Sequence, residues 1–458
     1  MTWVIRRPRR HASEIDWAAS IVMARVTDQV CAFEDGQDGE ISIQTSGRTV
    51  VMPALLPDLY PLDASKLPQP PYRELIWADR VTRAAEAASP LPVLLGTPAF
   101  HQHGSTLRLG ADLFGAAFLL LSGYQEACTG PRDAHGRFPG SQSLQARGGF
   151  VHRPIVDEFA ALLRHALRCL GLEALALREP DKTVLRISCD VDHPFDPTAR
   201  SITSCLLAVG ADIVRRRSAT LAARRAANMV LSRLEHHRLD PLYTFGWYMD
   251  QCERHGHQAT FFFLAARTPG VPDGSYDLED PRIPPLLRLI HARGHLIGLH
   301  GSYMSYRSSA AILAERERLM RTLDGLGIQV EIRSNRQHYL RWDPLMTPDL
   351  LDAAGFAEDL TGGFADTCGF RFGTAFPFRM WSWQRRRPLR LAQRPLLLME
   401  QTVLRGATDH RNVGRLLASA SVISGAMNRT GGELHILWHN SMLLSAAQRR
   451  GFTKVIGR

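Results

Sequence analysis

The sequence contains almost no lysine. Lys66, Lys182 and Lys454 are its only lysines among 55 Lys and Arg residues, so its basic character comes from arginine. The formal net charge of +10 favours anionic surroundings, such as a membrane face or an acidic substrate. No recognisable nucleic-acid-binding module lies among the basic stretches, and we therefore expect no nucleic-acid partner.

Cysteine pairs and long apolar runs are also missing. The seven cysteines are scattered, and none forms a C-x-x-C pair. This pattern argues against a disulfide framework or a cysteine-based zinc site and favours a reducing compartment. The longest apolar run, residues 114–121, is far too short to span a membrane, and no apolar stretch follows the N-terminal charges as in a secretory signal. We expect a cytoplasmic protein, with the surface of the inner membrane as an alternative location.

Residues 1–175 are expected to form a smaller, mixed α/β domain. Strands are predicted at 50–56 and 91–95, and helices at 112–124 and 156–170. The loop at 132–139 carries more charge than a simple turn needs. It is either a substrate or domain-interface loop or an ion-paired structural loop.

Residues 176–458 show a regular alternation of strand and helix patterns. Strands are predicted at 183–189, 259–264, 295–300, 331–335, 395–402 and 433–438, and helices at 284–293, 308–326, 347–354 and 409–427. Such alternation predicts an α/β fold with a parallel sheet or a (β/α) barrel, in which the active site lies at the carboxyl ends of the strands.

An insertion at 205–250 interrupts this alternation. Its arginines lie among Ala, Leu, Val and Met, at Arg215, Arg216, Arg217, Arg224, Arg225 and Arg233. A basic amphipathic helix of this kind either lies on an anionic membrane surface or packs on the barrel with its arginines in solvent. Peripheral membrane contact is therefore one of two open interpretations.

Chemically reactive side chains are predicted where strands end. The strand at 183–189 runs directly into Asp190, Asp192 and His193. Two carboxylates beside an imidazole can bind a cation and take a proton from water. Later strand ends supply further histidines, at His300, His338 and His439. These groups are expected to share one site, because the carboxyl ends of barrel strands gather at one face.

Four motifs in this order resemble those of the polysaccharide deacetylases, carbohydrate esterase family 4, with its NodB-like barrel. They are D-V-D-H-P at 190–194, G-L-H-G-S-Y at 298–303, R-Q-H-Y-L-R at 336–341 and W-H-N at 438–440. The set is similar to that of a bacterial subgroup found with surface-polysaccharide genes, which carries an extra N-terminal domain of unknown function. The hallmark of that domain resembles residues 112–118 and 132–139.

The resemblance implies a distorted (β/α) barrel that removes N-acetyl groups from a sugar or polysaccharide intermediate of bacterial surface-glycan biosynthesis. It also implies a divalent metal, with zinc expected first and cobalt, nickel or iron as alternatives. Carried over by position, Asp190 is the general base, Arg336 orients it, and His439 is the general acid. Asp192 and His300 are metal ligands. Substrate contacts are expected from Tyr303, His338, Tyr339 and Trp438.

One position departs from the family pattern. The second histidine of the family's H-x-x-x-H motif would fall at 304, where this chain has Met304. A thioether is a poor ligand for zinc, so a third ligand must come from elsewhere. His193 is preferred because it belongs to the first motif, although neighbouring residues of an extended chain point to opposite sides. His338 is the other candidate.

Met304 also motivates a different function, a non-catalytic carbohydrate-binding or scaffold protein on a degenerate deacetylase barrel. Another metal-assisted amide or ester hydrolase would use the same site. Asp359 is expected either to support Arg336 or to be a turn acid. Three aromatic residues form either a sugar-stacking face or part of the core, namely Phe378, Trp381 and Trp383.

Overall fold

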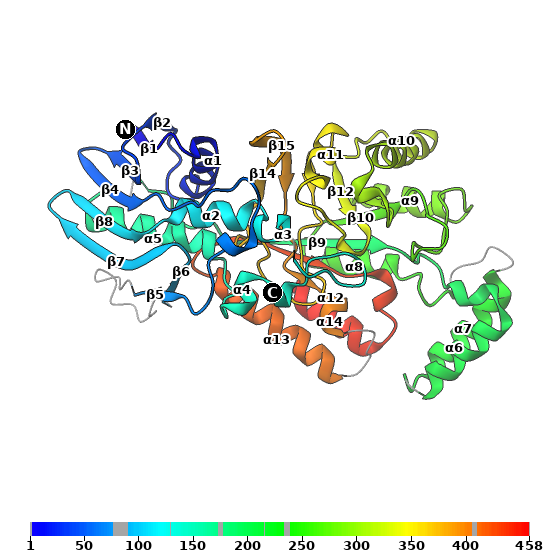
Figure 1. The fold of residues 1–458 in the computed structure, drawn as a ribbon. Helices are drawn as coiled ribbons and strands as arrows, with labels where there is room; N and C mark the ends of the chain where they lie inside the picture. The colour runs from blue at the N-terminus through cyan, green and yellow to red at the C-terminus, as the bar shows by residue number, and fades with distance from the viewer. Residues whose placement is uncertain are drawn as a thin grey trace.

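The structure is a computed structural model that describes residues 2–76, 90–128, 130–172, 177–214, 216–232, 239–404 and 410–457. Its fold is mixed α/β, with two large sheets that lie side by side along the molecule (Figure 1). Within these ranges, no helix is both long enough and apolar enough to cross a membrane.

The N-terminal part is built on a six-stranded mixed sheet in the order β2-β1-β3-β4-β8-β7. Its strands are β1 Trp3–Arg7, β2 Cys31–Asp35, β3 Glu40–Thr45, β4 Arg48–Pro53, β7 Gly96–His103 and β8 Thr106–Ala111. A separate pair joins β5 Arg73–Leu75 to β6 Leu91–Val93. The helices of this part are α1 Ala12–Met23, α2 Leu113–Leu121, α3 Tyr124–Ala127, α4 Leu144–Arg147 and α5 Ile155–Cys169.

Helix α2 starts at Asp112 because this side chain accepts hydrogen bonds from two backbone amides. Its Oδ1 accepts from the Gly115 N–H at 2.7 Å, and its Oδ2 accepts from the Leu55 N–H at 2.7 Å. A Cβ at Gly115 would lie 2.4 Å from Asp112 Oδ2, so the cap requires a glycine there. The aspartate and glycine of the 112–118 motif are thus explained by local structure.

The second part is a nine-stranded sheet in the order β14-β15-β13-β12-β11-β10-β9-β17-β16. All neighbouring pairs are parallel except β14 with β15. The strands are β9 Thr183–Val191, β10 Ala259–Leu264, β11 Leu296–Gly301, β12 Ser334–Gln337, β13 Glu358–Asp359, β14 Phe378–Ser382, β15 Arg387–Gln393, β16 Leu398–Met399 and β17 Gly432–Leu437. Every residue of β10 is buried, as expected for a strand covered on both faces.

Helices cover this sheet and alternate with its strands. They are α8 Phe245–Arg254, α9 Ile283–Ala292, α10 Ser309–Gly325, α11 Thr347–Ala353, α12 Glu400–Leu404, α13 His410–Met427 and α14 Ala446–Ile456. The predicted strand at 331–335 is shifted to Ser334–Gln337. The predicted strand at 395–402 was wrong for most of its length, because β16 has two residues and the chain turns helical at Glu400.

The predicted insertion at 205–250 extends past the end of the helical hairpin that the structure shows in this region. A short 3-10 helix, η4 Pro197–Arg200, leads into a hairpin of α6 Ile202–Val214 and α7 Ala219–Leu231, which projects from the body (Figure 1). Residues 245–254 instead form α8, whose Tyr248 hydroxyl donates to the Ser188 carbonyl at 3.1 Å. Of the arginines expected in the insertion, Arg215 and Arg233 lie outside the described residues.

One hydrophobic core runs through both parts of the chain. Trp17 of α1 and Phe118 of α2 each lie with ring centroids 5.4 Å from Trp381 of β14. The Trp17 indole also donates to the Arg379 carbonyl at 3.0 Å. Phe378, Trp381 and Trp383 are all buried here, so the core interpretation of these aromatics is confirmed.

Candidate active site

Strand β9 delivers two carboxylates to the same side of its carboxyl end. Asp190 and Asp192 are two positions apart, and alternate residues of an extended chain share a face. Val191 between them is fully buried in the core on the other side. Asp190 is also buried, whereas Asp192 is partly open to the cavity described below.

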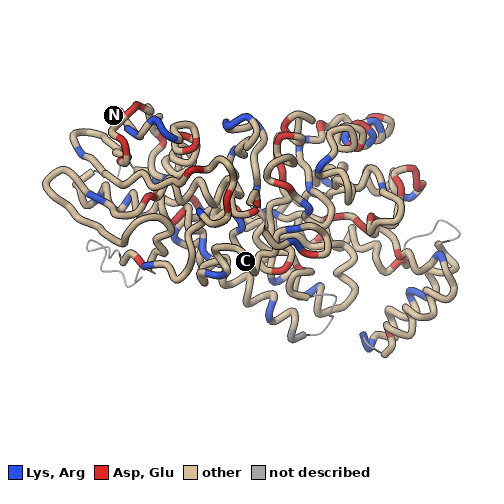
Figure 2. The backbone as a smooth tube through the Cα atoms, viewed as in Figure 1, with Lys and Arg blue, Asp and Glu red and all other residues tan. Residues whose placement is uncertain are grey.

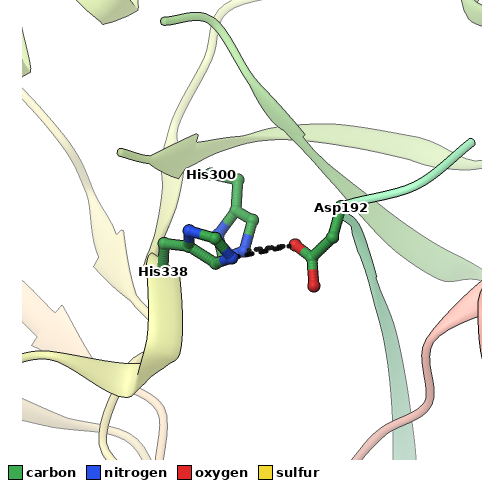
Figure 3. A group of neighbouring side chains, drawn as sticks. All are labelled: Asp192, His300 and His338. Atoms are coloured by element: carbon green, nitrogen blue, oxygen red, sulfur yellow. Dashed lines mark ion pairs between the residues drawn. The ribbon is translucent and has the colours of Figure 1, made fainter. Parts of the chain in front are cut away.

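Three side chains from the carboxyl ends of β9, β11 and β12 could hold a metal ion. Their ligand atoms lie within 4.8 Å of one another, on Asp192, His300 and His338. Nε2 of His300 lies 3.2 Å from Asp192 Oδ1, and Nε2 of His338 lies 3.4 Å from the same oxygen. Figure 3 shows both imidazole rings directed at the carboxylate.

The donor atoms of this group suit a divalent cation. Asp192 Oδ1 and His300 Nε2 are buried and have no hydrogen-bond partner among the described residues. The other nitrogen of His300, Nδ1, is 2.8 Å from the Arg336 carbonyl and must donate to it, which leaves Nε2 with a free lone pair. One carboxylate and two imidazoles form a ligand set typical of catalytic zinc.

Charges within the group reinforce one another. Burial alone would raise the pKa of Asp192, but the imidazoles of His338, His300 and His439 outweigh it and hold that pKa well below its usual range. Burial opposes the imidazolium of His338, yet Asp192 and Asp273 raise its pKa to about 9. The carboxylates of Asp192 and Asp273 therefore favour a positive charge at this place, either a proton on an imidazole or a cation.

His338 is fixed by a residue that was not predicted, Asp273. Oδ1 of Asp273 lies 3.0 Å from His338 Nδ1 and accepts from the Tyr303 backbone N–H at 2.8 Å. Oδ2 of the same side chain accepts from the Thr268 N–H at 2.6 Å. Carboxylate–histidine pairs of this kind orient metal-binding imidazoles. His338 thus takes the place that the sequence leaves empty at Met304, which is half-exposed and lies beside Arg341.

His193, the third ligand preferred from the sequence, does not join the three-residue group, which contains His338 instead. The backbone carbonyl of His193 accepts from Asn440 Nδ2 at 2.9 Å, which helps to set the course of the chain after Asp192. Its imidazole still lines the cavity, and Nδ1 is buried without a hydrogen-bond partner among the described residues. The alternation of an extended chain explains why Asp192 and His193 diverge.

Asp190 lies between the histidine group and Arg336 of β12. Its Oδ1 is 3.6 Å from Arg336 Nη1, and its Oδ2 is 3.7 Å from His300 Nε2. Arg336 is fully buried, and its Nη2 donates to the Ser188 hydroxyl at 3.1 Å. His435 lies 3.3 Å from the same nitrogen. The guanidinium is therefore held in place, with Nη1 directed at the Asp190 carboxylate.

His439 follows β17 and faces Asp192 from the opposite side of the site. Its Nε2 is 3.6 Å from Asp192 Oδ2, and its Nδ1 is 2.6 Å from Oε1 of Glu400. Glu400 is fully buried and also accepts from the His439 backbone N–H at 3.1 Å. Burial would lower the pKa of His439, but Glu400, Asp192 and Asp190 raise it to about 10. Glu400 is the second functional residue missed from the sequence.

A cavity of about 530 Å³ is lined by the side chains of Asp190, Asp192, His300, His338 and His439. Tyr339 is part of its wall, and Arg137 reaches it from the N-terminal part of the chain. Arg137 is paired with Asp133 at 2.7 Å and donates to the Tyr339 carbonyl at 2.8 Å. The loop at 132–139 is therefore both ion-paired and in contact with the second part of the chain.

Two predicted substrate contacts are placed differently. Tyr303 does not line the cavity, and its hydroxyl lies 3.0 Å from His135 Nδ1 of the same loop. Trp438 is fully buried, with its ring 5.3 Å from that of Phe452, so it belongs to the core. Trp438 and His439 are neighbours in an extended segment, and the side chain that reaches the cavity is the histidine.

Asp359 is a turn acid. Its Oδ1 accepts from the backbone N–H of Thr361 at 3.0 Å, two residues later. It is fully buried at the end of β13, and its carboxylate contributes to the electrostatic environment of Arg336 without an ion pair to it.

Comparisons with known proteins give two kinds of similarity. Residues 71–171 match the model of a family of unknown function, DUF7033. No curated protein gives a significant match. Several solved structures are similar to the chain at low sequence identity.

A protein described as a polysaccharide deacetylase, from Mycobacterium smegmatis, is 15% identical with a TM-score of 0.38, over 61% of this chain and 86% of that one. The chitin deacetylase of the fungal pathogen Colletotrichum lindemuthianum is 13% identical with a TM-score of 0.32, over 61% and 85%. A mutant CE4 family pseudoenzyme with restored enzymatic activity is 9% identical with a TM-score of 0.30, over 61% and 63%. Solved polysaccharide deacetylases are thus among the structures similar to this chain, as its motifs predict, and the domain of unknown function lies in its N-terminal part.

Proposed function

We propose that this chain is a metal-dependent hydrolase that removes N-acetyl groups from a sugar or polysaccharide intermediate of bacterial surface-glycan biosynthesis. The supporting observation is the meeting of a three-ligand group, a carboxylate and a protonated imidazole around one cavity. We further propose that residues 176–458 are a distorted (β/α) barrel of the polysaccharide deacetylase type and that residues 1–175 are an accessory domain. The mostly parallel sheet with its polar strand ends supports the barrel.

Asp192, His300 and His338 would hold the metal. When bound, a divalent cation at this place would polarise the acetyl carbonyl and favour deprotonation of the attacking water. Arg336 fixes one nitrogen of His300 through its backbone carbonyl, and Asp273 fixes one nitrogen of His338. Both rings therefore present Nε2 to the same place, with little freedom to turn away.

Asp190 is the proposed general base. It accepts one proton from water as the water oxygen bonds to the carbonyl carbon of the acetamido group. Arg336 restrains the carboxylate from behind, so the oxygen that faces the cavity stays available.

His439 is the proposed general acid. Its imidazolium donates the proton from Nε2 to the sugar nitrogen as the bond between carbon and nitrogen breaks. The products are acetate and a free amine, which balances the water consumed. Glu400 holds Nδ1 and keeps the ring charged before the proton is given. Asp190 and His439 thus act from different sides of the reacting carbonyl.

Met304 motivated the alternative of a non-catalytic carbohydrate-binding or scaffold protein. His338 weakens that alternative, because it supplies the nitrogen donor that residue 304 lacks. None of the seven cysteines, all of which lie in the described residues, forms a disulfide, which supports our proposal of a cytoplasmic location.

The test is acetate release by the purified protein, with zinc or cobalt added, from N-acetylated sugar nucleotides and lipid-linked N-acetylated sugars. Wild type should release acetate, and Asp190→Asn should lose at least about 100-fold in rate. Glu433→Gln, at an ion pair outside the cavity, is the matched control and should stay active. A wild type that retains metal and yet releases no acetate across the panel would favour the scaffold.

A further inference from the structure

The hairpin of α6 and α7 buries a network of charged side chains and exposes several large apolar ones. Asp212 of α6 is fully buried and is paired with Arg225 of α7 at 2.7 Å. Arg225 is buried as well and also pairs with Asp196, which precedes η4. Asn228 of α7 donates to Asp240 at 2.9 Å in the same buried network. A surface helix of a soluble protein normally has the opposite arrangement, with its apolar stripe against the body.

The outer face of α6 is a continuous apolar strip. Its exposed members recur at helical spacing and lie on one side of the helix, at Ile202, Leu206, Leu207, Ile213 and Val214. Leu207 is 77% exposed and Val214 is 75% exposed, which is unusual for side chains of this size. No charged residue interrupts the strip, because Asp212 points to α7.

Arginines border this strip. Arg200 lies just before α6, and Arg216 and Arg217 lie just after it. Arg200 and Arg217 are exposed, and the only acidic residue of α6, Asp212, is already neutralised inside the hairpin. Figure 2 shows basic residues at the outer end of the hairpin and mostly uncharged chain along it. The surface offered to solvent is therefore apolar in the middle and positive at its ends.

We propose that this strip docks on an anionic lipid bilayer. Helices that lie in a membrane interface combine an apolar face, which enters the boundary of the acyl chains, with arginines that reach the phosphate headgroups. The positive borders match a negative lipid surface, and the net charge of +10 adds long-range attraction. A protein partner or a second copy would not require basic residues at both ends of the strip.

The position of the hairpin gives this docking a consequence for the site. Helix α6 starts ten residues after Asp192, on the connection that leaves the carboxyl end of β9. The segment between them is short and fixed, since the Asp196 N–H donates to Asp240 at 3.0 Å. Docking of the strip would therefore tether the body, and with it the cavity, to the bilayer through this short connection.

The experiment is flotation of the full-length protein with vesicles of phosphatidylglycerol and phosphatidylcholine, compared with vesicles of phosphatidylcholine alone. We expect binding to the anionic vesicles that weakens as salt is raised. The double variant Leu206→Glu/Leu207→Glu should lose binding by at least about tenfold. Arg217→Gln should weaken it about fivefold, which corresponds to the attraction of one arginine to an anionic surface.

The matched control is Val30→Glu, a change of the same kind at a residue that is 89% exposed in the N-terminal part of the chain. It should bind vesicles as wild type does. All variants should keep the thermal unfolding midpoint of wild type, because the altered side chains face solvent. Failure of wild type to float with anionic vesicles overturns the proposal, and so does equal binding by the double variant. A vesicle-free dimer that the double variant dissociates would assign the strip to contact between copies instead.

Discussion

Nδ1 of His338 lies 3.0 Å from Oδ1 of Asp273, which comes from the loop between β10 and α9. His338 lies in a short 3-10 helix, and this contact orients its imidazole so that Nε2 faces Asp192. The loop that supplies Asp273 also supplies Gly274, whose Cβ position would lie 2.6 Å from the Asp192 carbonyl. The segment at 273–274 is therefore packed directly against the backbone that carries Asp192.

The identity of the third metal ligand gives the first prediction. Purified wild type should contain about one equivalent of zinc or a similar divalent metal by elemental analysis, and His338→Ala should lose most of it. Met304→Ala and His193→Ala should keep it, because neither side chain belongs to the three-residue group. Metal retained by His338→Ala and lost from His193→Ala would restore the ligand preferred from the sequence.

Asp273 should tune metal affinity without being a ligand. Asp273→Asn should weaken metal binding about 10- to 100-fold, as is usual when the carboxylate partner of a ligating histidine is removed. Competition with a chromogenic chelator measures this change. Asp280→Asn, in the same loop but paired with Arg282 instead of His338, is the control and should leave the affinity unchanged. Equal losses of metal affinity in the two variants would mean that the loop as a whole, and not the contact between Asp273 and His338, sets the affinity.

Glu400 should control the proton held by His439. Glu400→Gln removes a buried negative charge 2.6 Å from Nδ1, so the imidazolium becomes less stable. We expect kcat to fall about 100-fold with little change in KM, and activity to decline at a lower pH on the alkaline side. The pH dependence of acetate release at saturating substrate measures both. An unchanged alkaline limb would contradict the assignment of His439 as the acid that Glu400 stabilises.

Asp157 gives a prediction about stability. It lies in α5, is fully buried, and accepts from the Thr374 hydroxyl at 2.6 Å and the Ala375 N–H at 2.9 Å. Burial raises its pKa from the usual 3.8 to about 6. The folded protein thus holds this proton more tightly than the unfolded chain, and the associated stability is present below about pH 4 and is lost as the pH rises through about 6.

Chemical denaturation of wild type and Asp157→Asn at several pH values tests whether this stability is lost as the pH rises. The free energy of unfolding of wild type, relative to the variant, should fall by about 2 kcal/mol between pH 4 and pH 7. A difference that grows as the pH rises would contradict it.

The sequence predicts the scaffold of the site better than its supporting contacts. The apolar strand before Asp190 and the motif around His300 identify two strand ends, and the structure brings them together. Side-chain alternation then distinguishes Asp192, which joins the three-residue group, from His193. It likewise distinguishes His439, which lines the cavity, from the buried Trp438. The direction of a side chain can be predicted from this alternation only where the sequence shows at which residue the strand ends.

Asp273 and Glu400 could not be predicted from the sequence for a physical reason. Asp273 lies among Pro, Gly and Asp residues that resemble any polar loop, and its role depends on where that loop folds back. Glu400 lies in an apolar stretch that has the pattern of a strand but turns helical at this residue. Its partner His439 is 39 positions away in the chain.

The core shared by the two parts of the chain has a consequence for biosynthesis. Trp17 contacts a segment 362 positions later in the sequence, at Arg379 and Trp381. At ribosomal rates of roughly 5–20 residues per second, on the order of 20 to 70 s pass before that segment emerges. Until then Trp17, and Phe118 once it has been synthesised, lack the β14 residue Trp381 that packs against both. The nascent N-terminal part therefore presents an aromatic surface to chaperones until β14 has been synthesised.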